Sequence, residues 1–93
     1  MSLAALHEML NESQKVIQES PSESDRTWII IEHTYENKVF RQMLCVAKLD
    51  SSHWMLVKGI SVPANMDALR ELVFNTADSV RWLRTDEYQQ KMN

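Results

Sequence analysis

Apolar residues in the middle of the chain follow the period of β-strands rather than that of helices. Residues 27–34 are rich in Ile and include a Trp, which favours a strand, and residues 39–47 and 53–61 have the same character. Two short polar segments, 35–38 and 48–52, separate these runs and predict turns. The pattern therefore predicts a three-stranded antiparallel meander.

A first amphipathic helix is predicted over residues 3–18. Ser2 is a good N-cap, and Pro21 disfavours helical geometry in the residue before it. The apolar positions recur at intervals of three or four residues, as on one face of a helix. They are Leu3, Leu6, Met9, Leu10, Val16 and Ile17.

A second amphipathic helix is predicted from Met66 to Leu83, with Asn65 as its N-cap. Residues 85–87 then resemble another helix start, which leaves a short final helix or a tail for residues 88–92. The expected order is α-β-β-β-α. We therefore predict a single α+β domain spanning residues 1–93, with the meander packed by two amphipathic helices.

Both faces of this meander are rich in apolar residues. If each hairpin loop holds an even number of residues, alternation assigns every strand residue to a face, and Glu32 then lies beside Arg41 as a favourable pair. An uncovered face would forgo on the order of 10 kcal/mol of burial, and two helices cover only one face. The residues predicted to contact a partner are Ile29, Ile31, Phe40, Leu44, Val46, Met55 and Val57 on the sheet, with Phe74 and Trp82 on the second helix.

Composition adds little to this picture. The net charge is −3, and the single cysteine, Cys45, excludes an internal disulfide. The longest uninterrupted apolar run, residues 43–47, is far short of the ~20 residues that a membrane span needs, and no secretory leader is recognisable. We therefore expect a cytoplasmic protein without a membrane partner.

The polar side chains do not assemble a reactive site in this register. His33 and His53 fall at opposite ends of the meander, roughly 20 Å apart at 3.3 Å per residue, and Cys45 has apolar neighbours. Glycine-rich phosphate loops and nucleophile elbows are absent from the sequence. We expect no catalytic residue, metal, cofactor or small-molecule substrate, and hence no enzyme.

Three functions remain open. The leading hypothesis is a protein-interaction domain that forms a homodimer through a sheet face. The second is a nucleic-acid-binding module that uses Arg70, Arg81 and Arg84. The order α-β-β-β-α resembles that of the double-stranded-RNA-binding domain, although residues 65–70 lack the lysine cluster of that family. The third is an inhibitor or accessory subunit that adds its edge strand to another protein's sheet.

Overall fold

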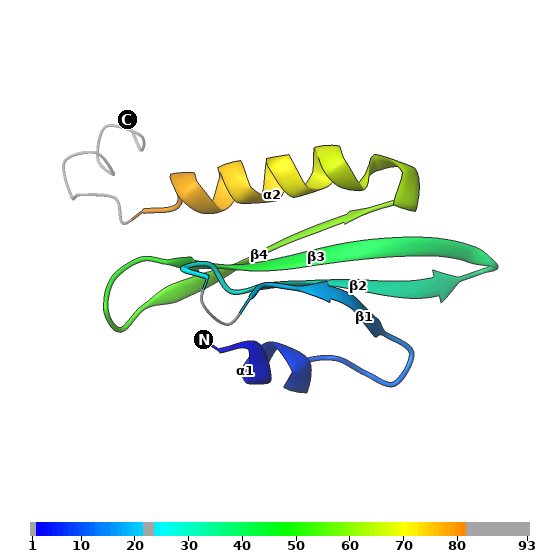
Figure 1. The fold of residues 1–93 in the computed structure, drawn as a ribbon, viewed down its shortest axis with the longest axis horizontal. Coiled ribbons are helices and arrows are strands. Elements are labelled where there is room, and N and C mark those ends of the chain that lie inside the picture. The colour runs from blue at the N-terminus through cyan, green and yellow to red at the C-terminus, as the bar shows by residue number, and fades with distance from the viewer. Residues whose placement is uncertain (1, 22–23, 82–93) are drawn as a thin grey trace, which may run out of the picture.

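The computed structural model describes residues 2–21 and 24–81, and these form an α+β fold with a four-stranded antiparallel sheet between two helices (Figure 1). The strands follow the order β1-β2-β3-β4. Helix α2 packs on one face of the sheet and α1 on the other, and we call these the upper and the lower face. The elements are α1 (Leu3–Glu8), β1 (Lys15–Glu19), β2 (Trp28–Tyr35), β3 (Lys38–Lys48), β4 (Trp54–Ser61), a 3₁₀ turn (Pro63–Asn65) and α2 (Met66–Ser79).

The β2–β3 hairpin confirms the first predicted turn. Tyr35 pairs with Lys38, and the two loop residues Glu36 and Asn37 have φ angles of 49° and 66°. Two positive φ angles in a two-residue loop are the mark of a type I′ turn, whose twist matches that of the strands. The even loop preserves the predicted register, and Arg41 donates to Glu32 over 3.1 Å.

The β3–β4 hairpin corrects the predicted faces of the third predicted strand. Lys48 pairs with Trp54, so the loop between them holds five residues, an odd number. Its tip is held by Asp50, whose carboxylate accepts from the backbone N–H groups of Ser52 and His53, each at 2.8 Å. The extra residue turns β4 over: Met55 and Val57 lie on the upper face, and Trp54 and Leu56 on the lower.

The N-terminal segment corrects the first predicted helix. Ser2 caps α1, as expected, but the helix ends at Glu8 and residues 15–19 form β1 instead. Between them the Asn11 side chain accepts from the backbone N–H of Ser13, and such local bonds compete with helix formation. β1 in turn supplies backbone partners to an edge of β2, a tertiary gain that overrides the apolar helical period.

Helix α2 begins at Met66, as predicted, and is shorter than predicted. It ends at Ser79, and Val80 already has an extended backbone. The rest of the predicted helix, from residue 82, and the predicted final segment, residues 85–92, lie outside the described residues.

Two apolar clusters lie on the two faces of the sheet. The upper cluster fills the space beneath α2, and its buried members are Ile30, Met43, Cys45, Met66, Leu69 and Val73. The lower cluster fills the space above α1, and its buried members are Leu6, Ile29, Ile31 and Leu44. Helix α1 contributes one buried side chain, whereas α2 contributes three, so the two covers are unequal.

Candidate interaction surface

Exposed apolar side chains gather along the outer edge of β4. Within the described residues β4 pairs only with β3, so its other edge has no strand beside it. Trp54, Met55 and Ile60 on this strand are 45%, 49% and 58% exposed, and Leu72 of α2 is 63% exposed. We call these four residues the β4 flank. An unpaired edge with large apolar side chains is a typical docking surface.

Gly59 allows α2 to approach β4 closely. A β-carbon at this position would lie 2.7 Å from Leu69 Cδ1 and 2.9 Å from Val73 Cγ2, closer than real contacts permit. The residue therefore sets the height of the helix above the strand.

The outward direction of Leu72 follows from the contacts of its helix neighbours. Arg70 donates to Gln18 on β1, and Phe74 packs against Trp28 on β2, so this side of α2 is turned toward the centre and far edge of the sheet. Leu69 and Val73 point down into the core. At 100° per residue Leu72 falls on the remaining flank, above the free edge of β4.

A shallow hollow adjoins the flank. It has a volume of about 260 Å³ and is lined by Phe40, Ile60, Ser61, Val62 and Asn65. Phe40 lies on the lower face of β3, where its ring stacks with that of His33 at a centroid distance of 5.9 Å. An apolar recess beside an unpaired strand can hold a bulky side chain of a partner.

The residues predicted for the partner contact are divided among several places. Ile29, Ile31 and Leu44 are buried beneath α1, and Val46 packs against their cluster. Phe40 lies in the hollow, while Val57 packs under α2 and Met55 belongs to the β4 flank.

The two predicted contact residues of the second helix divide as well. Phe74 packs against Trp28, with ring centroids 6.0 Å apart, and the Arg26 guanidinium lies 4.8 Å from the centre of its ring. Arg26 also forms an ion pair with Asp78. Phe74 thus joins the helix to the sheet within one chain. Trp82 lies outside the described residues.

The predicted nucleic-acid arginines are not gathered into one surface within the described chain. Arg70 is partly buried above the sheet and donates to Gln18 over 3.0 Å. Arg81 follows α2 and is exposed, and Arg84 lies outside the described residues.

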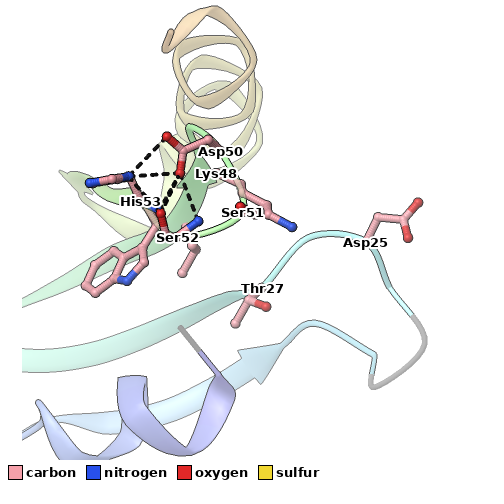
Figure 2. A pocket seen from close by; sticks show the side chains of 9 residues that line it. Asp25, Thr27, Lys48, Asp50, Ser51, Ser52 and His53 are labelled. Carbon is pink, nitrogen blue, oxygen red and sulfur yellow. Dashed lines mark hydrogen bonds and ion pairs between the residues drawn. The ribbon is translucent and has the colours of Figure 1, made fainter. Parts of the chain in front are cut away.

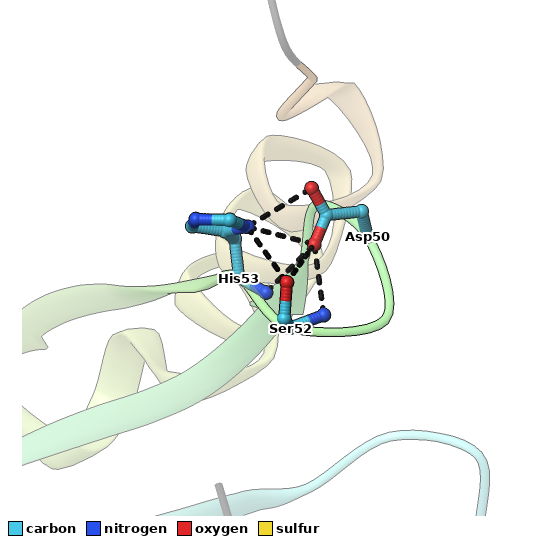
Figure 3. A network of polar contacts seen from close by, with 3 residues as sticks. All are labelled: Asp50, Ser52 and His53. Atoms are coloured by element: carbon cyan, nitrogen blue, oxygen red, sulfur yellow. Dashed lines mark hydrogen bonds and ion pairs between the residues drawn. The ribbon is translucent and has the colours of Figure 1, made fainter.

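Asp50, Ser52 and His53 bring the three side chains of a hydrolase triad together in one turn (Figure 3). The His53 Nδ1 atom lies 2.9 Å and 3.0 Å from the Asp50 carboxylate oxygens and 3.1 Å from Ser52 Oγ. In a triad the acid orients one ring nitrogen so that the other can accept the serine proton. Here both groups meet the same nitrogen, so this arrangement ties the turn and does not activate Ser52.

The turn borders a hollow of about 340 Å³ (Figure 2). Its lining includes Asp25, Thr27, Val46, Lys48 and Trp54 besides the turn residues. Among the described residues no three His, Cys, Asp or Glu side chains are grouped so that they could hold a metal ion.

Cys45 is fully buried in the upper cluster. Burial raises the pKa of its thiol, and the nearby Arg26 opposes this rise only in part. A buried neutral thiol is a poor nucleophile, so its position suits packing rather than catalysis.

Comparison with known protein families, with curated proteins and with solved structures finds no match to this chain. Among the described residues no helix is both long and apolar enough to cross a membrane. The assignment of a function therefore rests on the residues of the chain itself.

Sequence reasoning missed Trp54, Ile60 and Leu72 as contact residues. The signal that could have placed Trp54 and Ile60 is the Asp50-Ser51-Ser52 segment, because an Asx turn there implies a longer loop and turns β4 over. Leu72 lies within the second predicted amphipathic helix, and only the position of α2 above the edge strand shows that it faces outward.

Proposed function

We propose that this protein is a non-enzymatic interaction domain that forms a homodimer by antiparallel pairing of two β4 strands. One observation carries the proposal: two of the three exposed apolar residues of β4, Trp54 and Ile60, stand near its two ends, at equal distance from Val57. Trp54 precedes Val57 by three residues and Ile60 follows it by three. A strand with this arrangement is complementary to a second copy of itself.

The register of the proposed pair follows from symmetry. The two-fold axis that relates two antiparallel edge strands is perpendicular to the sheet, so each residue pairs with one on its own face. With the axis at Val57, Trp54 lies opposite Ile60 of the partner subunit, which forms an aromatic–β-branched pair. Met55 lies opposite the partner's Gly59, a position that α2 covers with Leu69 and Val73.

Charge favours this register over its neighbours. An axis at Lys58 would place two lysines directly opposite each other, which is destabilising. An axis at Leu56 would set Trp54 against the partner's Lys58 and leave Ile60 beyond the paired region. With the axis at Val57, Lys58 lies opposite Leu56 of the partner subunit, and Trp54 is directed to the hollow beside the partner's Ile60.

Helix α2 continues the proposed contact above the sheet. Leu72 lies over the free edge of β4, so the same symmetry brings it toward Leu72 of the partner subunit. Each large apolar side chain is worth roughly 1.5–3 kcal/mol when it passes from full exposure to burial. The four residues of the β4 flank are about half exposed in the single chain, so they offer a substantial part of this energy to dimerisation.

The mass of the protein in solution tests the proposal. We expect a dimer by light scattering coupled to size exclusion at about 1 to 100 μM, the range in which a modest interface associates. Ile60→Lys introduces a charge opposite the partner's Trp54 and should give a monomer with unchanged circular dichroism. Val39→Lys is the matched control, because Val39 is similarly apolar and 41% exposed but lies away from the β4 edge.

Two results would contradict the dimer. The first is a wild-type protein that stays monomeric over the whole concentration range. In that case the edge of β4 would be free to pair with a strand of another protein instead. An Ile60→Lys variant that stays as dimeric as the Val39→Lys control would exclude this edge as the contact.

A further inference from the structure

Three exposed lysines lie on the lower face of the sheet. The residues that point downward alternate with those of the upper face, and Lys38, Lys48 and Lys58 are all among them. The lower-face positions of β2, β3 and β4 include no Asp or Glu. None of the three lysines forms an ion pair with another described residue.

The arginines of the upper face and its border differ from these lysines. Arg26, Arg41 and Arg70 each donate to an acceptor within the chain, namely Asp78, Glu32 and Gln18. In a chain with a net charge of −3, cations without an internal partner are thus concentrated on the lower face. Such a concentration attracts an anionic ligand to that face.

Aromatic side chains accompany the lysines. Lys38 pairs across the strands with Tyr35, and Lys48 pairs with Trp54. Tyr35 is 65% exposed. Phe40 follows Lys38 on the same face of β3. We call Tyr35, Phe40, Trp54 and the three lysines the lysine–aromatic surface.

The spacing of the lysines suits an extended ligand. Lys38 and Lys48 are ten residues apart on β3, about 33 Å at 3.3 Å per residue. Lys58 lies opposite Leu44, between them. A small anion would contact one lysine only, whereas a polymer that crosses the face can contact all three.

We propose that the lysine–aromatic surface binds single-stranded nucleic acid. The ammonium groups hold phosphates, and the exposed rings stack against bases, which is how proteins bind single strands without base-specific contacts. An acidic peptide would also satisfy the lysines, but it offers no planar groups for the rings. A duplex keeps its bases stacked inside and leaves the rings without partners.

This inference is independent of the dimer, because every residue in it belongs to one chain. In the proposed dimer the two lower faces would adjoin along β4 and form one longer surface. Trp54 belongs to both surfaces and is therefore left unchanged in the tests.

Fluorescence anisotropy with a labelled oligothymidylate of about 12 nucleotides measures the binding. We expect saturable binding at about 50 mM salt, with a slope of log affinity against log salt near −2, as about 0.7 counterions are released for each of three phosphates. Lys38→Glu and Lys58→Glu should each weaken binding about tenfold. Lys15→Glu should not, because Lys15 is also exposed but lies on the upper face of β1.

Tyr35 separates stacking from charge. Tyr35→Ala should weaken binding several-fold and leave the salt slope unchanged, and Tyr35→Phe should restore the wild-type affinity, because the ring is what stacks. The Ile60→Lys monomer adds a lysine to the lower face and should therefore bind at least as tightly per chain as the wild-type protein. It therefore separates failure of this inference from failure of the dimer.

Three results would overturn the inference. The first is no binding by the wild-type protein at low salt. The second is an equal loss in Lys15→Glu and Lys38→Glu, which indicates only unspecific attraction. The third is stronger binding of a labelled polyglutamate peptide of the same length, which would assign the surface to an acidic protein. The salt dependence of binding by the wild-type protein tests the contact with phosphates even where a variant fails to fold.

Discussion

The two faces of the sheet are covered by helices of very different length. α2, Met66–Ser79, spans fourteen residues and follows β3 and β4 on the upper face. α1, Leu3–Glu8, spans six residues and lies beneath β2 on the lower face. The upper face is closed by a helix in close contact with Gly59, whereas the lower face is closed only around Leu6.

The two faces also differ in the side chains that they expose. The upper cluster holds the thiol of Cys45 and the contact between Phe74 and Trp28, and its charged neighbours are paired within the chain. The lower face leaves lysines and aromatic rings in contact with solvent. We infer that the upper face contributes more to the stability of the fold, and that the uncovered part of the lower face, with the β4 edge, is available to partners.

The largest expected effect compares two neighbours on β3 that point to opposite faces. Met43 is buried beneath α2 and Leu44 is buried above α1. Truncating a buried side chain to alanine costs about 2–5 kcal/mol, and more where the surroundings cannot collapse into the cavity. Met43→Ala should therefore lie near the top of this range and Leu44→Ala near the bottom, because the short α1 can shift.

Urea unfolding measures both losses, with Val39→Ala as the control. Val39 is on the same strand and 41% exposed, so its truncation should change the free energy of unfolding by less than about 0.5 kcal/mol. An equal loss of unfolding free energy in the two variants, or a larger loss in Leu44→Ala, would contradict the view that α2 holds its face more tightly than α1.

The next effect tests the close approach of α2 to β4. Gly59→Ala places a β-carbon against Leu69 and Val73, and overpacking of this kind costs about 1–3 kcal/mol. In a Leu69→Ala background the same substitution should cost less than in the wild-type background, since the nearest atom, Leu69 Cδ1, is gone while Val73 Cγ2 remains. Chemical denaturation of the four proteins gives this cycle, and a Gly59→Ala variant as stable as wild type would contradict the contact.

The smallest effect concerns the pH dependence of the upper cluster. Burial raises the pKa of the Cys45 thiol, so the unfolded chain loses this proton at a lower pH than the folded chain. The stability that Cys45 contributes is full below an unfolded pKa of about 8.5 and is lost as pH rises through the folded pKa.

Unfolding free energies measured at about pH 7.5 and about pH 9.5 test this dependence. The decrease between the two should be larger in the wild-type protein than in Cys45→Ala, which lacks the titrating group. An identical decrease in the two proteins would show that the thiol is not protected by α2.

The sequence predicts the parts of the fold that depend on local chemistry. The Glu36-Asn37 turn and the Glu32–Arg41 pair follow from turn preference and strand alternation, and the structure confirms both. The α+β class and the start of α2 at Met66 are confirmed as well. Each of these features is decided by a few neighbouring residues.

The parts that the sequence did not predict depend on distant partners. Residues 15–19 carry a helical apolar pattern but become a strand because β2 offers them an edge. One additional loop residue before Trp54 exchanges the faces of β4, and with them the exposed and buried residues of that strand. The candidate site was missed because the exposure of Trp54 and Ile60 depends on this register, for which the Asp50-Ser51-Ser52 segment was the available signal.

A disulfide across the proposed two-fold axis tests the central claim most directly. In the register with the axis at Val57, the two copies of this residue lie opposite each other about 4.5–5.5 Å apart, within the span of a disulfide. Val57→Cys in a Cys45→Ala background should therefore yield a covalent dimer on mild oxidation, and Val39→Cys in the same background should not. No more covalent dimer from residue 57 than from residue 39 would contradict the pairing of the β4 strands.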